Sequence, residues 1–329
     1  HMEQRRFSGK GHWYHETQSN HAQTDVLPLV PEAANVDDRF LLDLALPDDI
    51  LTSCAGWLTP ARTLCHLLFP LDTPVNRLHT LSAYDRLSTA LTVAQACGVQ
   101  RLCNHYAALL APLPGPDSSR ESNRRLAEIT QYARQLASSP DVIDDKAQNQ
   151  LDEVGLTTYD IVLINQIIGF VGFQARVVAV FQALLGHPVR WLPGHHIQPH
   201  TLPVSFSRWT ATLPAVELKY ASALQLEALS RWQAEPALEA LTPVLCHEPM
   251  LLNLTGEILL HHPQSEGPVS SMISAARALL VASPDRFSAA QLTPLTGSGL
   301  SPEKAINLLT RDAFYGWLDR LRVALGKEE

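Results

Sequence analysis

The sequence has 329 residues, a formal net charge of −8 at pH 7 and 46% hydrophobic residues. A chain of this length has room for two domains of about 150 residues, each able to bury a core of its own. Only 25 Lys and Arg stand against 33 Asp and Glu, so the chain lacks the basic surface that phosphate binding requires. We therefore expect no nucleic-acid partner.

Two further features of composition bear on location. The longest uncharged apolar run covers residues 161–175 and ends at Arg176. It is shorter than the stretch of about 18 residues that a membrane span requires, so we expect no membrane segment. The chain has five cysteines, an odd number, and no signal-peptide pattern, which together favour a reducing cytoplasm.

In chain order, residues 1–38 are polar and irregular, with a single cluster at His12, Trp13, Tyr14 and His15, and they predict an N-terminal arm. Helical periodicity dominates from there on, and alternating strand patterns are scarce. Residues 111–122 form a loop rich in proline, glycine and serine. We expect an all-α protein with a first domain at 39–190, a linker at 191–215 and a second domain at 216–329.

One helix stands out by its apolar content. It is predicted from about Thr158 to Leu185, with isoleucines and valines spaced three and four residues apart. Because it is apolar around most of its circumference, we expect it to be the buried centre of the first domain. Its glycines, Gly169 and Gly172, would let another helix approach closely.

Two segments 144 positions apart repeat the same features, which predicts a duplicated domain. The first begins at Gly155-Leu-Thr-Thr and reaches Phe170, Gly172, Phe173 and Arg176; the second begins at Gly299-Leu-Ser-Pro and reaches Phe314, Gly316, Trp317 and Arg320. In both, a Ser or Thr is placed to cap a helix, and Pro302 occupies a first helical position. A weaker third echo begins at Leu81-Ser82, 75 residues before Leu156-Thr157.

The segment from Leu81 to His105 resembles the core helix pair of the carboxymuconolactone decarboxylase and AhpD-like alkylhydroperoxidase superfamily. The later Gly-Leu-Ser/Thr segments are similar to the closing helix of that domain, and residues 245–249 resemble a Leu-Ala-His-Asp-Pro step of peroxidase-related members. The order of segments resembles the double-domain, YciW-type proteins. The resemblance covers most of residues 40–326 and implies two tandem AhpD-like helical domains, often assembled into trimers or hexamers. We therefore expect a homo-oligomer, with flat helix surfaces at Gly169, Gly172 and Gly316.

The chain departs from the family where the family's chemistry resides. AhpD-like peroxidases carry a Cys-x-x-Cys pair whose thiolate attacks the peroxide and whose second thiol resolves the product. With His105 set on the family histidine, the two cysteine positions fall on Gly98 and Arg101; a shift of one residue places them on Val99 and Leu102. In the second domain, the stretch we equate with this site, 277–292, has neither Cys nor His and is broken at Ser283-Pro-Asp. That copy is expected to be catalytically empty.

Three residues of the first domain remain candidates for catalysis: Cys103, His105 and Asp85. A cysteine close to a histidine can be an activated thiol, and Asp85 lies near the position of the family glutamate. Each also has a structural interpretation, because a cysteine packs well in a core, a histidine on an apolar helix is usually hydrogen-bonded, and Asp85 is placed to cap a helix.

The remaining histidines and cysteines give no pattern typical of a cofactor or metal site. His195, His196 and His200 match no common zinc spacing and are interpreted as linker residues, and His261-His262 is interpreted as a helix end. Cys246 is expected to pack in the core. The sequence has no phosphate-binding glycine loop, so no organic cofactor is implied.

Three functions therefore stay open. The first is a peroxidase-related oxidoreductase of weak or lost activity that uses Cys103 and His105 alone. The second is an acid-base, decarboxylase-like enzyme with His105 and Asp85 as proton shuttles. The third is a non-catalytic helical scaffold that binds a metabolite or a protein.

Overall fold

The computed structural model describes residues 6–7, 12–13, 27–188, 197, 208–262 and 270–328, and within them the protein is all-α, as predicted. The helices are α1 (Asp48–Leu68), α2 (Ala83–Cys97), α3 (Gln100–Leu110), α4 (Arg120–Ser138), α5 (Asp145–Glu153), α6 (Thr158–Leu184), α7 (Ala223–Trp232), α8 (Thr242–Leu245), α9 (Pro249–Leu260), α10 (Ser271–Ala282), α11 (Ala289–Gly297) and α12 (Pro302–Leu325). Short 3-10 helices are η2 (Pro31–Ala34), η3 (Pro140–Val142), η4 (Leu218–Tyr220) and η5 (Pro284–Arg286).

The strands of the described residues are two or three residues long. They are β1 (Arg6–Phe7), β2 (His12–Trp13), β3 (Leu27–Pro28), β4 (Trp209–Ala211) and β5 (Gly326–Glu328). β1, β2 and β3 form one antiparallel sheet, and β4 pairs with β5 in another. The second pairing fastens the segment before α7 to the end of α12.

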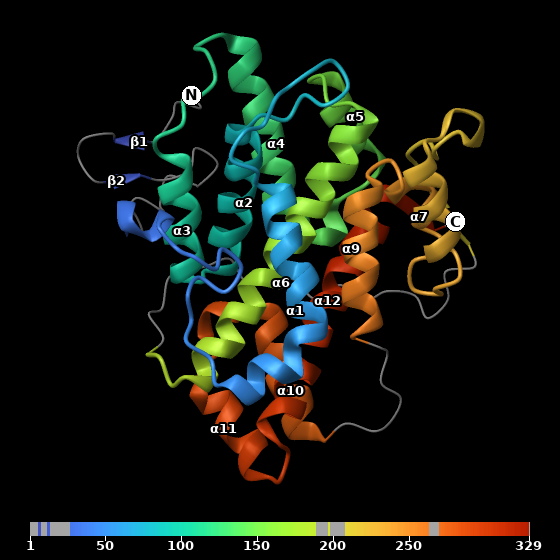
Figure 1. Ribbon diagram of the computed structural model, residues 1–329. Coiled ribbons are helices and arrows are strands. Elements are labelled where there is room, and N and C mark those ends of the chain that lie inside the picture. The colour runs from blue at the N-terminus through green and yellow to red at the C-terminus, as the bar shows by residue number, and fades with distance from the viewer. Residues whose placement is uncertain are drawn as a thin grey trace.

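Helix α6 is buried, as the sequence predicted, but it is the centre of the whole molecule and not of the first domain alone. It runs through the helical body in Figure 1, with α1 in front of it and α2 and α12 beside it. It begins at a capping box in which Thr157 and Asp160 satisfy each other's backbone amides. Of its 27 residues, 22 are buried. The helix is long and apolar enough to cross a membrane, but 89% of its most apolar window is buried inside the protein, as in the core helix of a folded domain.

The backbone repeats itself at the 144-residue spacing. Ser139 and Ser283 have almost identical dihedral angles, with φ of −147° and −146°, and each precedes a 3-10 helix that begins with proline. Gly155 and Gly299 both adopt the left-handed conformation, with φ of +96° and +100°, just before α6 and α12. Such φ values favour glycine, so the same local signal starts both long helices.

Two buried arginines join the halves reciprocally. Arg176 in α6 donates from Nη2 to the Val281 carbonyl at 2.8 Å, and Arg320 in α12 donates from Nη2 to the Ala137 carbonyl at 2.8 Å. The two contacts are related by the 144-residue spacing. Arg320 is 144 positions after Arg176, and Val281 is 144 positions after Ala137. Each guanidinium thus satisfies a carbonyl at the end of a helix in the other half, α10 or α4, where the helix dipole favours a cation. The contact is isologous, as in a two-fold dimer.

Helices α1 and α9 are a second reciprocal pair. They pack against each other, and each is hydrogen-bonded to the central helix of the opposite half. In α1, Nε1 of Trp57 donates to Asn307 of α12 at 3.0 Å. In α9, Thr255 accepts from Nε2 of Gln166 in α6 at 3.4 Å. After α1 the chain forms α2 and α3 before it reaches α4. After α9 it passes directly to α10, the counterpart of α4. Within the described residues, the second half therefore has no equivalent of α2 and α3.

This arrangement corrects one sequence assignment. Residues 277–292 were equated with the site-bearing helix pair of the first half. The 144-residue register instead aligns them with 133–148, the end of α4, η3 and the start of α5. The expected break at Ser283 is present, because α10 ends at Ala282. The second half lacks the site because the helix pair is missing from its described residues.

The expected close approach at the glycines of α6 occurs inside the molecule. A Cβ on Gly169 would lie 1.9 Å from Cδ1 of Trp317, so the indole occupies the space of the missing side chain. Gly169 was expected to offer a surface to another subunit; that explanation was wrong, because α12 of the same chain covers it. The buried hydrophobic residues of both halves form one continuous core, from Phe40 to Leu325.

Candidate functional site

Asp85 lies in the first turn of α2, where its Oδ2 has both a backbone and a side-chain partner. It accepts from the backbone N–H of Ser82 in a capping box, as its structural interpretation predicted, and its Oδ2 lies 2.8 Å from Nη1 of Arg125. Arg125 also donates to Thr80, whose N–H donates to Asp160 at 2.8 Å. This network ties the starts of α2 and α6 together. It gives Asp85 a structural task at the start of α2.

Cys103 is buried in α3, with 7% of its surface exposed. Burial raises the pKa of its thiol well above the ordinary value, and the neighbouring Cys97 raises it further. The nucleophile in thiol chemistry is the thiolate, which this environment disfavours. All five cysteines are free and buried, and burial raises the pKa of Cys54 and Cys65 to about 12 and of Cys246 to about 11.

His105 is 2% exposed and holds the N-terminal segment against α3. Its Nδ1 lies 2.8 Å from the carbonyl of Ala33 in η2, so this nitrogen carries the proton and donates it. Burial lowers the pKa of the imidazole, and the bond to the Ala33 carbonyl partly opposes that effect. The ring is therefore a neutral, hydrogen-bonded core group, which fits its structural interpretation.

The fold does not bring the three candidates together. Asp85 lies 12 residues before Cys97, the end of α2, and at 1.5 Å per residue this is roughly 18 Å from the short link into α3. Cys103 lies at the other end of the helix pair, in the first turns of α3. His105 is two positions further on, about 200° around the helix, so the two side chains leave α3 in different directions. Among the described residues, no hydrogen bond or ion pair joins any two of them.

A polar cavity of about 280 Å³ lies at the link between α2 and α3. Gly98 and Arg101 line it, and these are the two positions where the first alignment places the family cysteines. Val99, one of the positions in the alternative alignment, lines it too. Leu102, the other position of the alternative alignment, is not part of the lining.

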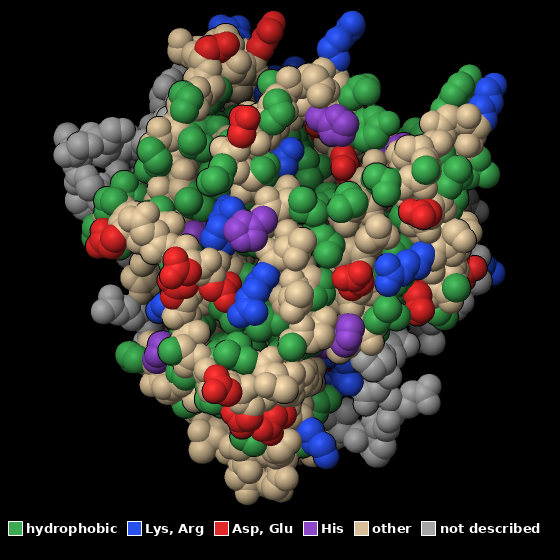
Figure 2. Space-filling model, in the orientation of Figure 1, with side chains coloured by type: hydrophobic (Ala, Val, Ile, Leu, Met, Phe, Trp, Pro, Cys, Tyr) green, Lys and Arg blue, Asp and Glu red, His purple; other side chains and the backbone are tan. Residues whose placement is uncertain are grey.

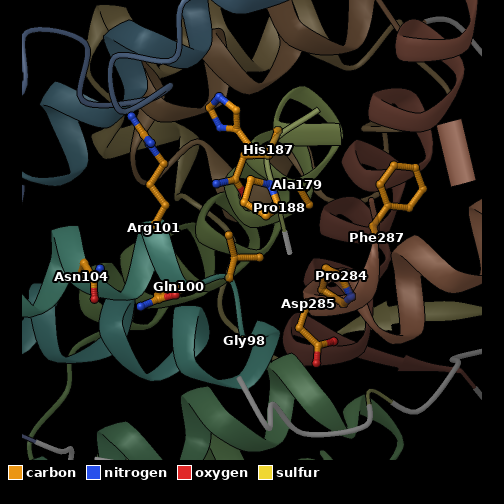
Figure 3. Close-up of a pocket in the computed structure, with 12 residues that line it drawn as sticks. Gly98, Gln100, Arg101, Asn104, Ala179, His187, Pro188, Pro284, Asp285 and Phe287 are labelled. Atoms are coloured by element: carbon orange, nitrogen blue, oxygen red, sulfur yellow. The ribbon is translucent and has the colours of Figure 1, made fainter. Parts of the chain in front are cut away.

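The cavity is built from both halves of the chain. Figure 3 shows Gln100, Arg101 and Asn104 on α3 at one side, and Pro284, Asp285 and Phe287 of the η5 segment at the other. His187 closes it from the end of α6.

Arg101 is held in place by the backbone. Its Nε and Nη2 both donate to the carbonyl of Leu42, at 3.2 and 2.7 Å. Because both bonds go to an uncharged carbonyl, its positive charge is not neutralised by them. The lining therefore combines a fixed cation, three carboxamides (Gln100, Asn104 and Gln182) and a carboxylate, and it offers donors and acceptors to a small polar molecule.

Sequence reasoning missed most of this lining. Asp285 is 184 positions from Arg101 in the sequence, since 285 minus 101 is 184, and only the packing of η5 against α6 brings the two into one cavity. Gly98 and Arg101 had been considered only as positions where cysteines are missing. No local pattern marks them as a binding site.

The other histidines and cysteines considered as metal ligands either have structural roles or lie outside the described residues. His195, His196 and His200 lie outside the described residues. His261 follows the end of α9, as expected, and its Nδ1 lies 2.9 Å from the Glu257 carbonyl. Cys246 is buried and bonds to the Pro243 carbonyl. Within the described part of the chain, no group of three His, Cys, Asp or Glu is placed to hold a metal ion.

No protein-family model matches the chain, and no curated protein matches it. What the fold and site define is therefore a class: an all-α protein of two related halves, with a polar cavity where the first half meets the second.

Proposed function

We propose that this chain is a relative of the AhpD-like superfamily in which peroxidase chemistry has been lost and the cavity is kept as a binding site for a small polar molecule. One observation carries the proposal. The two positions that the first alignment assigns to the family cysteines, Gly98 and Arg101, line a cavity, whereas Cys103 is not part of that lining and is buried. The place for a substrate is present and the reactive thiols are not.

The chemistry of the remaining cysteines supports a loss of activity. Peroxide reduction requires an accessible thiolate and a second thiol to resolve the sulfenic acid. Cys97 and Cys103 are both buried, and burial raises the pKa of each. A dithiol cycle has neither its nucleophile nor its resolving partner at this site. Binding, in contrast, needs only the polar lining that the cavity has.

The loss of catalysis is tested by a peroxide-consumption assay. The full chain, with hydrogen peroxide and dithiothreitol as reductant, should consume peroxide no faster than buffer, and Cys103→Ser should behave identically. Consumption well above buffer that disappears in Cys103→Ser would show that a one-cysteine peroxidase survives.

The binding role is tested by a ligand panel. Small amino acids, sugars and dicarboxylates are added singly, and the shift in melting temperature is measured. A ligand of the cavity should stabilise the native chain and should not stabilise Asn104→Trp, because the indole fills the space. Pro112→Trp, an exposed change on the loop after α3, serves as the matched control. If no compound stabilises the native chain selectively, the cavity has no role of this kind.

A further inference from the structure

A second pocket lies at the opposite end of α3 from the polar cavity. It is enclosed by the α1–α2 connection, the first turns of α2, the last turn of α3 and the loop that follows α3. Its volume is about 130 Å³. Its walls are mainly apolar, from Phe69, Leu71, Leu87, Leu109 and Leu113. Figure 2 shows hydrophobic side chains interspersed with charged and other polar groups over the upper part of this face. Leu71 is completely exposed there.

Two arginines, Arg39 and Arg86, interrupt this apolar lining. Arg86 is anchored by the backbone, because its Nη1 donates to the Leu68 carbonyl at 3.1 Å and its Nε to the Leu81 carbonyl at 3.5 Å. Its Nη2 makes no hydrogen bond to the described part of the chain. Arg39 makes a single side-chain contact there, from Nη1 to Nδ1 of His66 at 3.4 Å.

Neither arginine forms an ion pair with a carboxylate of the described residues. The carboxylates nearest to Arg86 in their electrostatic effect are Glu248, Asp160 and Asp85. Each has another partner: Glu248 bonds to His79 at 3.2 Å, Asp160 accepts from Thr80, and Asp85 binds Arg125. They moderate the positive potential of Arg86 without occupying its free donor.

We propose that this pocket binds a small apolar monocarboxylate, with its ring or short chain between the leucines and its carboxylate on Arg39 and Arg86. Guanidinium groups match carboxylates in both charge and planar geometry. An apolar tail is expected because most of the side chains that line the pocket are apolar, among them Phe69, Leu87 and Leu109. The volume sets the size, since an engineered protein cavity of about 150 Å³ accepts benzene. This pocket is slightly smaller, at about 130 Å³, so only the ring of a benzoate-sized acid would lie inside it, with the carboxylate outside at the open end.

This site is separate from the polar cavity. Arg101 and Leu109 lie eight residues apart on α3, about 12 Å along the helix axis. The inference does not depend on the proposed function, because it stands on a different lining and a different ligand chemistry.

The test measures binding of benzoate and of uncharged benzamide to the full chain by titration calorimetry. Benzoate should bind saturably, and benzamide at least about tenfold more weakly, because it lacks the charge that strengthens the bonds to the arginines. Arg39→Gln should also weaken benzoate binding about tenfold. This variant is chosen because Arg39 contributes little to the fold, and its melting temperature provides the check. Arg124→Gln removes an exposed arginine paired with Glu153 and should leave benzoate binding unchanged.

Three outcomes would overturn the proposal. One is the absence of saturable benzoate binding at millimolar concentration, and another is equal affinity for benzoate and benzamide. The third is loss of benzoate binding in Arg101→Gln with Arg39→Gln unaffected, because the carboxylate would then lie in the polar cavity.

Discussion

The two central helices, α6 and α12, begin with the same local signals and end in different environments. Each follows a left-handed glycine and a Ser or Thr cap, and each carries an arginine that reaches into the other half. Yet 22 of 27 residues of α6 are buried, against 11 of 24 in α12. The helix pair α2 and α3 explains the difference, because α2 covers a face of α6 and the second half has no described counterpart of that pair.

The comparison also explains where the polar cavity lies. The cavity forms where the link between α2 and α3 meets η5 of the second half. The pair α2 and α3 has no counterpart in the described residues of the second half, whereas η5 has a counterpart, η3, in the first half. A symmetric duplication alone would have no such cavity. Four measurements test how far the symmetry of the halves extends.

The largest effect is expected at Gly169, which breaks the symmetry because its counterpart at 313 is alanine. In Gly169→Ala the new methyl group would collide with Trp317 and displace its hydrogen bond to Gln166. We expect a loss of about 3 kcal/mol in unfolding free energy, measured by chemical denaturation. Gly172→Ala is the control, since its Cβ would come no closer than 3.4 Å to Nη1 of Arg176, and it should be neutral or slightly stabilising. Equal losses would show that the close approach at Trp317 does not matter.

The reciprocal arginines should respond as a matched pair. Arg176→Met and Arg320→Met each leave helix-end carbonyls without their donor, and we expect losses of about 2 to 3 kcal/mol for both. Because the contacts are related by the 144-residue spacing, the two values should agree within about 1 kcal/mol. Denaturation curves of the two variants measure this. A severe loss from one variant with no effect from the other would contradict the two-fold relation.

The third prediction concerns His262, a buried histidine in the core. Its ring packs among Trp57, Phe173 and Phe314. Burial lowers its pKa to about 3, with smaller contributions from Arg311 and His261. Below pH 6.5 the unfolded chain binds a proton that the folded chain does not, so this group's contribution to stability falls as pH decreases from about 6.5 toward 3.

Between pH 7 and pH 5 the loss from this one group is about 2 kcal/mol. His262→Phe should therefore lose about 2 kcal/mol less over this interval than the native chain, in denaturation at the two pH values. His66→Gln, which changes an exposed histidine, provides the control. An unchanged pH dependence in His262→Phe would show that the buried imidazole is not the acid-sensitive group.

The smallest effects are expected at the helix caps. Thr157→Ala removes a cap and also the bond from the Thr157 hydroxyl to the Leu78 carbonyl, and should cost about 1 to 2 kcal/mol. Ser301→Ala removes only a cap and should cost about 0.5 to 1 kcal/mol. Thermal melts of the two variants rank them. The reverse order would mean that the start of α12 is held more firmly than that of α6.

Much of the fold could be predicted because its signals are local. The start of α6 at Thr157, the start of α12 at Pro302 and the capping role of Asp85 depend on residues within one helical turn. The apolar circumference of α6 predicted its central position. The loop expected at 111–122 ended early, because Ser119 caps α4 and residues from Arg120 onward are helical.

The candidate site could be predicted only in part. Cys103, His105 and Asp85 remain predictions as catalytic residues, and their surroundings favour the structural interpretation of each. The polar cavity was missed because its walls come from α3, the end of α6 and η5, which are distant in the sequence. The boundary between the halves, at 191–215, lies mostly outside the described residues.

The sequence by itself determined the helical class, the duplication and the starts of the two central helices, because capping and periodicity act over a few residues. Only the tertiary structure decided that the halves share one core, that Trp317 fills the space above Gly169, and that Asp285 faces the same cavity as Arg101. These are contacts between residues more than a hundred positions apart. Packing and geometry fix such contacts in three dimensions, and no local pattern in the chain encodes them.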